Sequence, residues 1–522
     1  MKSFFDCLSR PFRQHLSLFL FIFVLTTLLD VYQYTTQSTL KFTVLVASHN
    51  FMNSYLLTLL YTLFPRKLKR IYLVLITIVV SVFSIIDIFS VIKFHHPFDK
   101  DVATVIRGTN LNESLEFLAS YLSWNLVVVI LLFSVFGYWL YRTSKRPSVV
   151  GNKITLTAIF VLFSSVAMNC YAPHIWAYGF FGKIQELTDV EKTPDLKEYY
   201  THPRIEVVGN QPQKVVMIIG ESFAREHSSL YGYGKKTNPK LAKLVADSSL
   251  LVFKSVNSTA THTVPAFKSF MSTYRSEYGD SLKWYEFTTL PEVVRLASYR
   301  SSWISNQSPV GFYDNVVAAY ARLCDSVNFV GDHYAGLAKT NLDGELVAPL
   351  RDHPKDGKRF FFVHLMGSHP QFESRYPSNY SHFRAADYME FPEHQRENRA
   401  AYDNTILYND AVVYDLIQEF KTEEAVVVYF SDHGLDVYES DPNYCSHANR
   451  SDAFSREVSK RIPFMVYLSP RYQKSFPEVT ERLRSHLETP YVTENLIYTM
   501  MDLMGVRFVE NDEVQKYSLL TK

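Results

Sequence analysis

The chain has 522 residues, more than a single ordinary domain needs, so we expect at least two folded units. Its net charge of +1 gives no electrostatic argument for a nucleic-acid partner. Its 4 cysteines include no C-x-x-C pair, which argues against a zinc site built from thiolates. The spacing of Cys324 and Cys445 leaves open whether these two residues form a disulfide.

The first third of the chain contains several apolar segments long enough to cross a bilayer, which takes about 20 residues. They are His15–Tyr32, Phe42–Phe64, Ile71–Ile92, Trp124–Tyr141 and Ile154–Ala172. These segments predict an N-terminal α-helical membrane domain with five transmembrane helices, covering residues 1–173.

Basic residues at the ends of these segments indicate how the helices are oriented. The basic groups are Lys2 with Arg10 and Arg13, the segment Arg66–Arg70, and the segment Tyr141–Pro147. Because Lys and Arg accumulate on the cytoplasmic side, all three groups are expected inside the cell. Five crossings then leave residues 205–522 outside, joined to the membrane by an interfacial helix and linker over 174–204.

Beyond residue 205, short apolar runs alternate with helical patterns. The runs that predict strands are KVVMIIGES, LLVFKSV, YRSSWISNQ, RFFFVHLMGSHP, EEAVVVYFSDHG and RIPFMVYLSP. Helical patterns such as RAAYDNTILYNDAVVYDLIQEF lie between them. Continuous apolar strands separated by helices predict an α/β domain with a mostly parallel sheet covered on both faces.

Polar side chains gather where these strands end, and ligands bind at that edge of a parallel sheet. The residues are Glu221, Asn306, His364, His369, Asp432 and His433. Carboxylates and an imidazole without thiolates suit a catalytic zinc with an open coordination position. An isolated Asp-His-Gly is more readily explained by a capping aspartate beside a hydrogen-bonded histidine. Several polar strand ends together favour the metal.

Four segments resemble the lipopolysaccharide phosphoethanolamine transferases, membrane-anchored members of the alkaline phosphatase and sulfatase superfamily. They are GESFAREHSSLYGYGKKTNPKL, HLMGSHPQF, ILYNDAVV and YFSDHG. SYRSSWISNQ and RYPSNY are most similar to the branch that acts on the lipopolysaccharide core. The resemblance covers the whole chain. It implies an inner-membrane protein whose residues 205–522 form a sulfatase-like catalytic domain in the periplasm.

The resemblance also implies which residues bind the metal. The implied ligands are Glu221, Asp432, His433 and a threonine that is also the nucleophile. Three threonines are candidates: Thr259, Thr261 and Thr263. Relatives carry an apolar residue and then Ser or Thr eight and nine positions after the nucleophile. Met271 and Ser272 therefore select Thr263.

Other positions match residues that relatives use around the substrate. His369 and His447 match histidines near the transferred phosphate, where they could act as acid, base or charge clamp. The candidate substrate-binding residues are Asn306, Thr109 and Glu113. Thr109 and Glu113 lie four apart on one helix face, like a pair that binds the ethanolamine head group. The asparagine expected one turn earlier is Val105 in this chain.

The implied reaction begins with attack of the zinc-activated Thr263 hydroxyl on phosphatidylethanolamine, which expels diacylglycerol. The covalent phosphoethanolamine-enzyme then transfers its group to an envelope glycolipid, either the lipopolysaccharide core or lipid A. Two alternatives remain: transfer of glycerol phosphate, or another phosphodiester reaction, on the same scaffold, and a non-enzymatic membrane sensor. Sulfate-ester hydrolysis is not expected, because none of the cysteines lies in a C/S-x-P-x-R motif.

Overall fold

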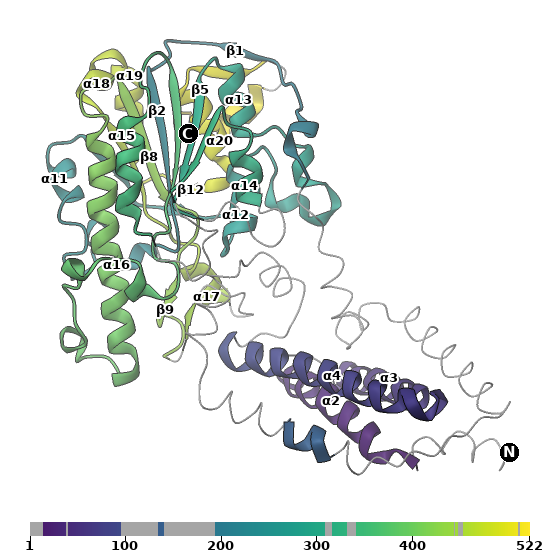
Figure 1. Ribbon diagram of the computed structural model, residues 1–522. Coiled ribbons are helices and arrows are strands. Elements are labelled where there is room, and N and C mark those ends of the chain that lie inside the picture. Colours follow the sequence, from purple (N-terminus) through teal and green to yellow (C-terminus); the bar gives the residue numbers. More distant parts are fainter. Residues whose placement is uncertain are drawn as a thin grey trace. The chain divides into compact units, whose positions relative to one another are not determined.

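A computed structural model describes the chain in several segments. They are residues 14–37, 40–94, 134–139, 194–307, 316–330, 341–442, 444–446, 453–509 and 512–521. The described residues up to 139 form one compact unit, and those from 194 onward form a second (Figure 1).

The first unit contains helices at the first three predicted spans. They are α2 (Leu16–Gln37), α3 (Leu40–Leu63) and α4 (Arg66–Phe94). Leu18, Leu57 and Leu73, one from each helix, share an apolar core. No helix among the described residues combines the length and the apolar character that crossing a membrane requires. Residues 134–139 of the fourth predicted span are helical, and the fifth, Ile154–Ala172, lies outside the described residues.

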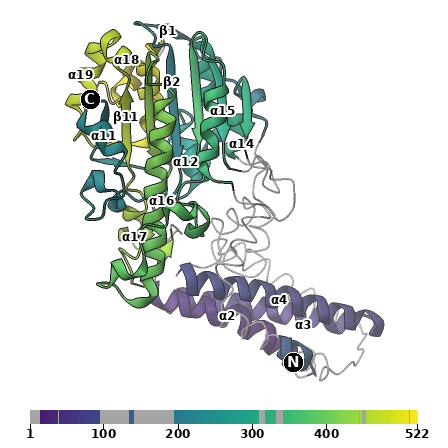
Figure 2. The ribbon, with the colours of Figure 1, turned by 60° about the vertical axis from the view of Figure 1, so that its left-hand side comes forward.

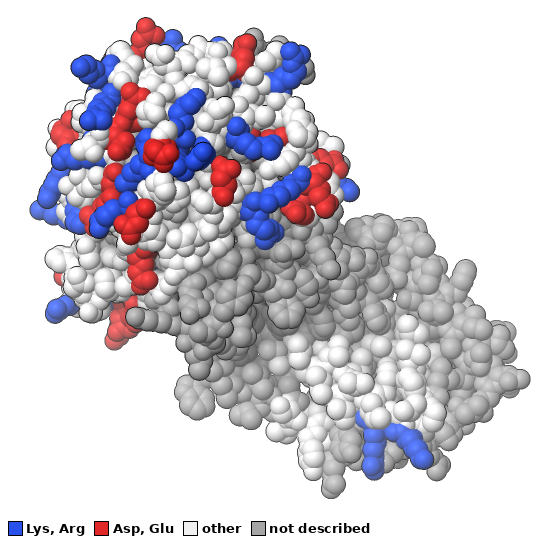
Figure 3. Space-filling model, turned by 45° about the horizontal axis from the view of Figure 1, so that its top comes forward, with Lys and Arg blue, Asp and Glu red and all other residues white. Residues whose placement is uncertain are grey.

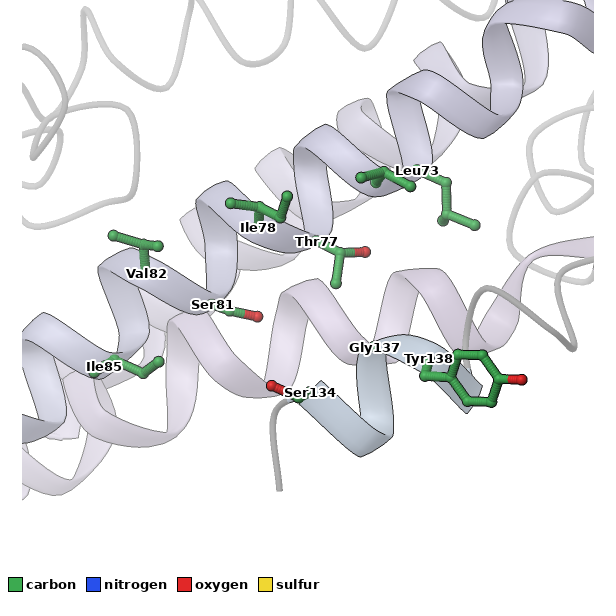
Figure 4. Close-up of a pocket in the computed structure, with 10 residues that line it drawn as sticks. Leu73, Thr77, Ile78, Ser81, Val82, Ile85, Ser134, Gly137 and Tyr138 are labelled. Atoms are coloured by element: carbon green, nitrogen blue, oxygen red, sulfur yellow. The ribbon is translucent and has the colours of Figure 1, made fainter. Parts of the chain in front are cut away.

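An apolar cavity of about 410 Å³ lies between α4 and the helical residues 134–139 (Figure 4). Leu73 and Val82 line it from α4, and Gly137 lines it from the short helix. A Cβ atom at Gly137 would lie 2.9 Å from the side chain of Thr77. The missing side chain at position 137 therefore lets these two helical segments approach closely.

The second unit is built on a seven-stranded sheet with the order β3-β11-β8-β2-β7-β5-β6 (Figures 1 and 2). Its strands are β2 (Lys214–Gly220), β3 (Leu250–Phe253), β5 (Arg300–Ser305), β6 (Ser326–Phe329), β7 (Arg359–His364), β8 (Ala425–Ser431) and β11 (Phe464–Leu468). Four of its six neighbouring pairs are parallel, and β11 runs antiparallel to both β3 and β8. The predicted α/β domain with a mostly parallel sheet is confirmed.

Helices cover both faces of this sheet, and alternate residues of β2 point into two separate apolar cores. Met217 packs in one core and Ile218 in the other. The first core also contains residues of α12 (Thr263–Phe270), α13 (Leu290–Leu296), α14 (Val316–Ala321), α18 (Pro470–Ser475), α19 (Pro477–Ser485) and α20 (Leu496–Leu503). The second contains residues of α11 (Leu241–Ala246), α15 (Val347–Asp352) and the long α16 (Glu393–Gln418). Burial on both faces explains the apolar runs in the central strands β2, β7 and β8.

Smaller elements surround this sheet in the described part of the second unit. Helix α17 spans Ala453–Val458. Three two-stranded sheets pair β1 (Ile205–Val207) with β13 (Val506–Phe508), β9 (Asp436–Val437) with β10 (Cys445–Ser446), and β4 (Val256–Asn257) with β12 (Tyr491–Val492). Cys324 and Cys445 are both free thiols, so they do not form a disulfide with each other.

One face of the second unit carries charged side chains of both signs (Figure 3). Figure 3 shows Lys and Arg interspersed with Asp and Glu over the face in view. This mixed surface agrees with the chain's net charge of +1. On the face in view, the two signs largely offset one another.

Candidate metal centre and active site

Three predicted ligands meet at the carboxyl ends of the two central strands. Glu221 directly follows β2, and Asp432 and His433 directly follow β8. The strands are parallel, with Gly220 opposite Ser431, so the residues after them lie side by side. His433 Nε2 lies 3.3 Å from Glu221 Oε1 and 3.5 Å from Asp432 Oδ2. Each of the three residues offers one ligand atom within 4.8 Å of the others, a spacing that could hold a metal ion.

The hydrogen bonds around this triad fit a metal ion. Asp432 Oδ1 accepts hydrogen bonds from the backbone N–H groups of Ser222 and His433. Asp432 Oδ2 is buried and has no hydrogen-bond partner among the described residues. His433 Nδ1 donates to the carbonyl of Gly434 at 2.8 Å, so Nε2 is the ring nitrogen that faces the carboxylates of Glu221 and Asp432. A buried carboxylate oxygen with no hydrogen-bond partner among the described residues, close to a histidine ring nitrogen, suits a cation site.

The electrostatics of the triad also favour a bound metal ion. Burial and the Glu221 carboxylate raise the pKa of Asp432 well above its usual range. Burial alone would lower the pKa of His433, but the carboxylates of Asp432 and Glu221 raise it to about 9. Without a cation, the Asp432 carboxyl group therefore retains its proton, and the ionised Glu221 lies beside the protonated His433 ring. A divalent metal ion would supply the positive charge in place of these protons.

Of the three candidate threonines, Thr263 contacts the triad. Its hydroxyl donates to Glu221 Oε2 at 3.1 Å and lies 3.4 Å from His433 Nε2. Thr263 is the first residue of α12, and Pro265 follows within the first turn, where a proline is tolerated. The free amides at this helix N-terminus favour negative charge on an attacking oxygen or a phosphoryl group.

The other two threonines have different partners. The hydroxyl of Thr259 lies 3.3 Å from that of Thr493, which also accepts a hydrogen bond from the Thr259 backbone N–H. The hydroxyl of Thr261 lies 2.9 Å from Nδ1 of His262. The partners of both hydroxyl groups therefore lie outside the triad.

His369 lies near the triad, at the end of the loop that follows β7. Arg375 donates to the His369 carbonyl at 3.2 Å, which holds the loop. Burial would raise the pKa of Glu221, but the positive charges of His433 and His369 lower it well below its usual range. His369 therefore lies close enough to act on the site electrostatically. Its side chain is only partly buried, so it can also reach a substrate.

Asn306 and His364 lie at strand ends but have structural partners. The Asn306 side-chain amide donates to the Asn341 carbonyl at 3.1 Å and to Asp343 at 2.8 Å, so both of its hydrogens are used inside the domain. His364 is fully buried, and its Nδ1 lies 3.3 Å from the Ser305 hydroxyl. Burial lowers the pKa of His364 to about 4, so this histidine is neutral. His447, Thr109 and Glu113 lie outside the described residues.

Sequence reasoning missed Gln307, which contacts a metal-ligand candidate. Its side-chain amide donates to Glu221 Oε2 at 3.3 Å and to the Leu365 carbonyl at 3.0 Å. Gln307 therefore ties the Glu221 carboxylate to the end of β7. The available signal was its position directly after Asn306, where β5 ends at the ligand-binding edge of the sheet.

Gly367 is a second residue whose role became visible only in the structure. Its φ of +53° lies in the left-handed region that favours glycine. A Cβ atom there would lie 2.6 Å from the backbone oxygen of Glu221 and 2.8 Å from its nitrogen. The Gly367 N–H donates to Asp343 at 2.8 Å, which fixes the loop against the Glu221 backbone. Position 367 thus sets where the Glu221 carboxylate lies.

The sheet is mostly parallel, and a carboxylate–imidazole triad and a hydroxyl group lie at the carboxyl ends of its strands. This arrangement is typical of metal-dependent enzymes of the α/β class. The Sulfatase family profile matches residues 213–506. The match covers more than half of the 522 residues, so the chain belongs to the Sulfatase family.

Several relatives support the resemblance to phosphoethanolamine transferases, which is confirmed. The chain is 27% identical over 486 residues to "Phosphoethanolamine transferase EptC" of Escherichia coli (strain K12), covering 85% of this chain and 82% of the relative. A crystal structure of the C-terminal periplasmic domain of EcEptC from Escherichia coli, in complex with Zn, has a TM-score of 0.55 and 27% identity. That alignment covers 61% of this chain and 89% of the other.

A full-length neighbour shares the fold. The integral membrane protein lipooligosaccharide phosphoethanolamine transferase A (EptA) from Neisseria meningitidis has a TM-score of 0.67. The two chains are 19% identical, and the alignment covers 99% of this chain and 98% of that one. At this identity the likeness concerns the fold alone.

Proposed function

We propose that this protein is a zinc-dependent transferase that moves phosphoethanolamine from phosphatidylethanolamine to a cell-envelope glycolipid. Support comes from the relatives named phosphoethanolamine transferase and from the zinc complex of the EcEptC periplasmic domain. The acceptor is the lipopolysaccharide core or lipid A, and the segments SYRSSWISNQ and RYPSNY favour the core.

The observation that carries this proposal is the position of the Thr263 hydroxyl. It lies 3.1 Å from Glu221 Oε2 and 3.4 Å from His433 Nε2, at the N-terminus of α12. Thr263 also begins the sequence TVPAF, where sulfate-ester hydrolases have C/S-x-P-x-R. A threonine stands in place of Cys or Ser, and Phe267 in place of Arg, which argues against sulfate chemistry.

Glu221, Asp432, His433 and Thr263 would hold the zinc ion. When bound, zinc lowers the pKa of a hydroxyl in its coordination sphere and offsets charge on phosphoryl oxygens. The Glu221 carboxylate fixes the position of the Thr263 oxygen, and the helix N-terminus favours the negative charge that develops there.

In the first half of the reaction, the phosphate ester to diacylglycerol is exchanged for a phosphate ester to Thr263. The Thr263 oxygen loses its proton to solvent as it forms a bond to phosphorus, and the bond from phosphorus to the diacylglycerol oxygen breaks. His369 gives its proton to the departing diacylglycerol oxygen. In the second half, an acceptor hydroxyl passes its proton to the now neutral His369 as its oxygen attacks phosphorus. The bond from phosphorus to the Thr263 oxygen then breaks, and that oxygen regains a proton from solvent.

The covalent intermediate provides the test of this function. Incubation of the purified, zinc-loaded protein with phosphatidylethanolamine and no acceptor should add about 123 Da, the mass of the phosphoethanolamine group, to the protein. Peptide mapping should find the added mass on Thr263. An adduct formed from phosphatidylglycerol instead would indicate glycerol-phosphate transfer. Release of diacylglycerol with no adduct on any residue would contradict the covalent mechanism.

We further propose that residues 1–173 anchor the chain in the inner membrane, 174–204 form an interfacial helix and linker, and 205–522 form the periplasmic catalytic domain. The basis is the five apolar segments and the basic residues that flank them. A reporter enzyme that is active only in the periplasm, fused after Lys522, should be active. A reporter active only in the cytoplasm, fused at the same position, should be silent. The reverse pattern would contradict the orientation.

A further inference from the structure

A second cavity, which lies in the C-terminal unit, has no role in the proposed chemistry. It measures about 610 Å³, within the range of about 300–1,000 Å³ typical of small-molecule sites. The lining residues that matter here are Glu226, His227, Tyr233, Lys235, Arg399 and Tyr438. They combine aromatic rings with groups that donate and groups that accept hydrogen bonds.

The segments that follow the metal-ligand candidates form part of the cavity wall, and Arg399 of α16 forms another part. Glu226 and His227 lie in the segment after Glu221, and Tyr438 lies in the segment after His433. Tyr402 of α16 connects the first of these segments to the cavity. Its hydroxyl donates to the Ser222 carbonyl at 2.7 Å and accepts from the Ala224 N–H at 2.8 Å. Its ring packs edge-on against His227, with 4.9 Å between ring centroids.

The charges of the cavity wall already compensate one another. His227 is 2% exposed and lies between Asp403 at 2.5 Å and Glu439 at 3.2 Å. Burial would lower the pKa of His227, but these two carboxylates raise it to about 9, so the ring is protonated. Arg399 lies 3.5 Å from the same Glu439. The principal cationic groups of the wall therefore have carboxylate partners, which disfavours a free anion as the ligand.

Aromatic groups supply the other part of the wall. Tyr438 has a φ of +67°, an unusual conformation for a bulky residue, and strained backbone of this kind concentrates at ligand sites. The Tyr438 hydroxyl accepts a hydrogen bond from Asn398 at 2.7 Å, and the Tyr233 hydroxyl donates to Asp403 at 2.7 Å. Both rings are thereby held in fixed positions with only part of their surface buried.

We propose that this cavity binds a sugar unit of the acceptor glycolipid, an inference that rests on the proposed transferase function. Sugar hydroxyl groups both donate and accept hydrogen bonds, which matches the paired carboxylates and cations of the wall. The C–H faces of a sugar ring pack against aromatic side chains. A saccharide held here contacts both segments that follow the metal-ligand candidates, so binding positions the acceptor relative to Thr263.

The test measures saccharide binding directly, without any transfer of phosphoethanolamine. Full-length, zinc-loaded protein in detergent is titrated with lipopolysaccharide oligosaccharide that has been deacylated and dephosphorylated, and with inorganic phosphate. We expect saturable binding of the saccharide, with no competition from phosphate. Tyr438→Gly should raise the saccharide Kd about tenfold, because it removes an aromatic surface. Glycine accepts the positive φ at this position, so the backbone is retained.

Matched controls separate a local effect from a loss of folding. Ser248→Gly replaces another residue with positive φ, at 62°, which is exposed and does not line the cavity. It should leave the saccharide Kd unchanged. Lys235→Ala should raise the Kd about threefold because it removes a partly exposed hydrogen-bond donor of the lining. Lys236→Ala, which changes an exposed neighbour outside the lining, should leave the Kd unchanged. Zinc content and unfolding temperature equal to those of the wild type verify that each variant is folded.

The outcomes separate this inference from the proposed function. Equal saccharide binding by wild type and Tyr438→Gly, or competition by phosphate alone, would overturn the sugar site. Formation of the Thr263 adduct in the same preparation would still support the transferase. Saccharide binding that depends on Tyr438, in protein that forms no adduct from phosphatidylethanolamine, would support the sugar site and count against the proposed donor reaction.

Discussion

Replacement of Thr263 by alanine is expected to lower phosphoethanolamine transfer by about 10⁴-fold or more, as removal of a nucleophile does in covalent enzymes. The Thr263 hydroxyl is the described threonine oxygen that contacts both Glu221 and His433. Alanine is a good helix former, so α12 should keep its first turn. The measurement is the rate of head-group transfer from labelled phosphatidylethanolamine to lipopolysaccharide, together with the mass of the protein after incubation with donor alone.

Thr261→Ala is the matched control, because it removes a hydroxyl two residues away whose partner is His262 rather than the triad. It should retain at least about a third of the wild-type rate, as expected for one neutral hydrogen bond outside the reacting groups. If the Thr261 variant were inactive and the Thr263 variant active, the nucleophile would be misassigned. An active Thr263→Ala protein that carries no adduct would eliminate covalent catalysis at this site.

Asp432→Asn is expected to abolish stoichiometric zinc binding and, with it, transfer. Asparagine can keep the Oδ1 contacts to the N–H groups of Ser222 and His433. It removes the charge of the buried Oδ2, which has no partner among the described residues. Without zinc, burial and the Glu221 carboxylate already favour the neutral form of Asp432, so the neutral amide should not lower the unfolding temperature of the zinc-free protein.

Chelation gives the complementary measurement. A free zinc concentration of about 1,000 times the Kd stabilises a folded protein by about 4 kcal/mol. A chelator removes this stabilisation and should therefore lower the unfolding temperature of the wild type by several degrees. The same chelator should leave Asp432→Asn unchanged. Asp415→Asn, on the exposed face of α16, should behave like the wild type. Full zinc content in Asp432→Asn, or a wild type indifferent to chelator, would show that the metal lies elsewhere or is not needed.

The strands of the sheet could be predicted because burial on both faces leaves a simple signature. Runs such as Val426–Phe430 are apolar at every position, and the predicted strand at each such run was found. The direction of β11 carries no such signature, because its antiparallel pairing depends on the path of the chain before it. Strand β6 was missed because it lies at the edge of the sheet and its residues are largely exposed.

The part of the site that could be predicted consists of ligand residues that directly follow a strand. Asp432 and His433 stand next to each other in sequence, and the parallel order of β2 and β8 then places Glu221 beside them. Gln307 and Gly367 were not predictable in this way. A glutamine or a glycine occurs in many structural settings, so its residue type alone does not predict a role in a metal site. Their roles arise from contacts with Glu221 that only the folded chain creates.

The pairing of β2 with β8 also governs when the metal site can exist during folding. Ser222 and Asp432, which are joined by a hydrogen bond, lie 210 residues apart along the chain. Contacts of such long range form late and slowly, because closing the intervening loop costs entropy before the pairing is gained. A one-residue slip of register would move Glu221 to the opposite face of the sheet from Asp432. A partly folded chain therefore lacks the complete ligand set, and zinc can stabilise the native sheet without directing its assembly.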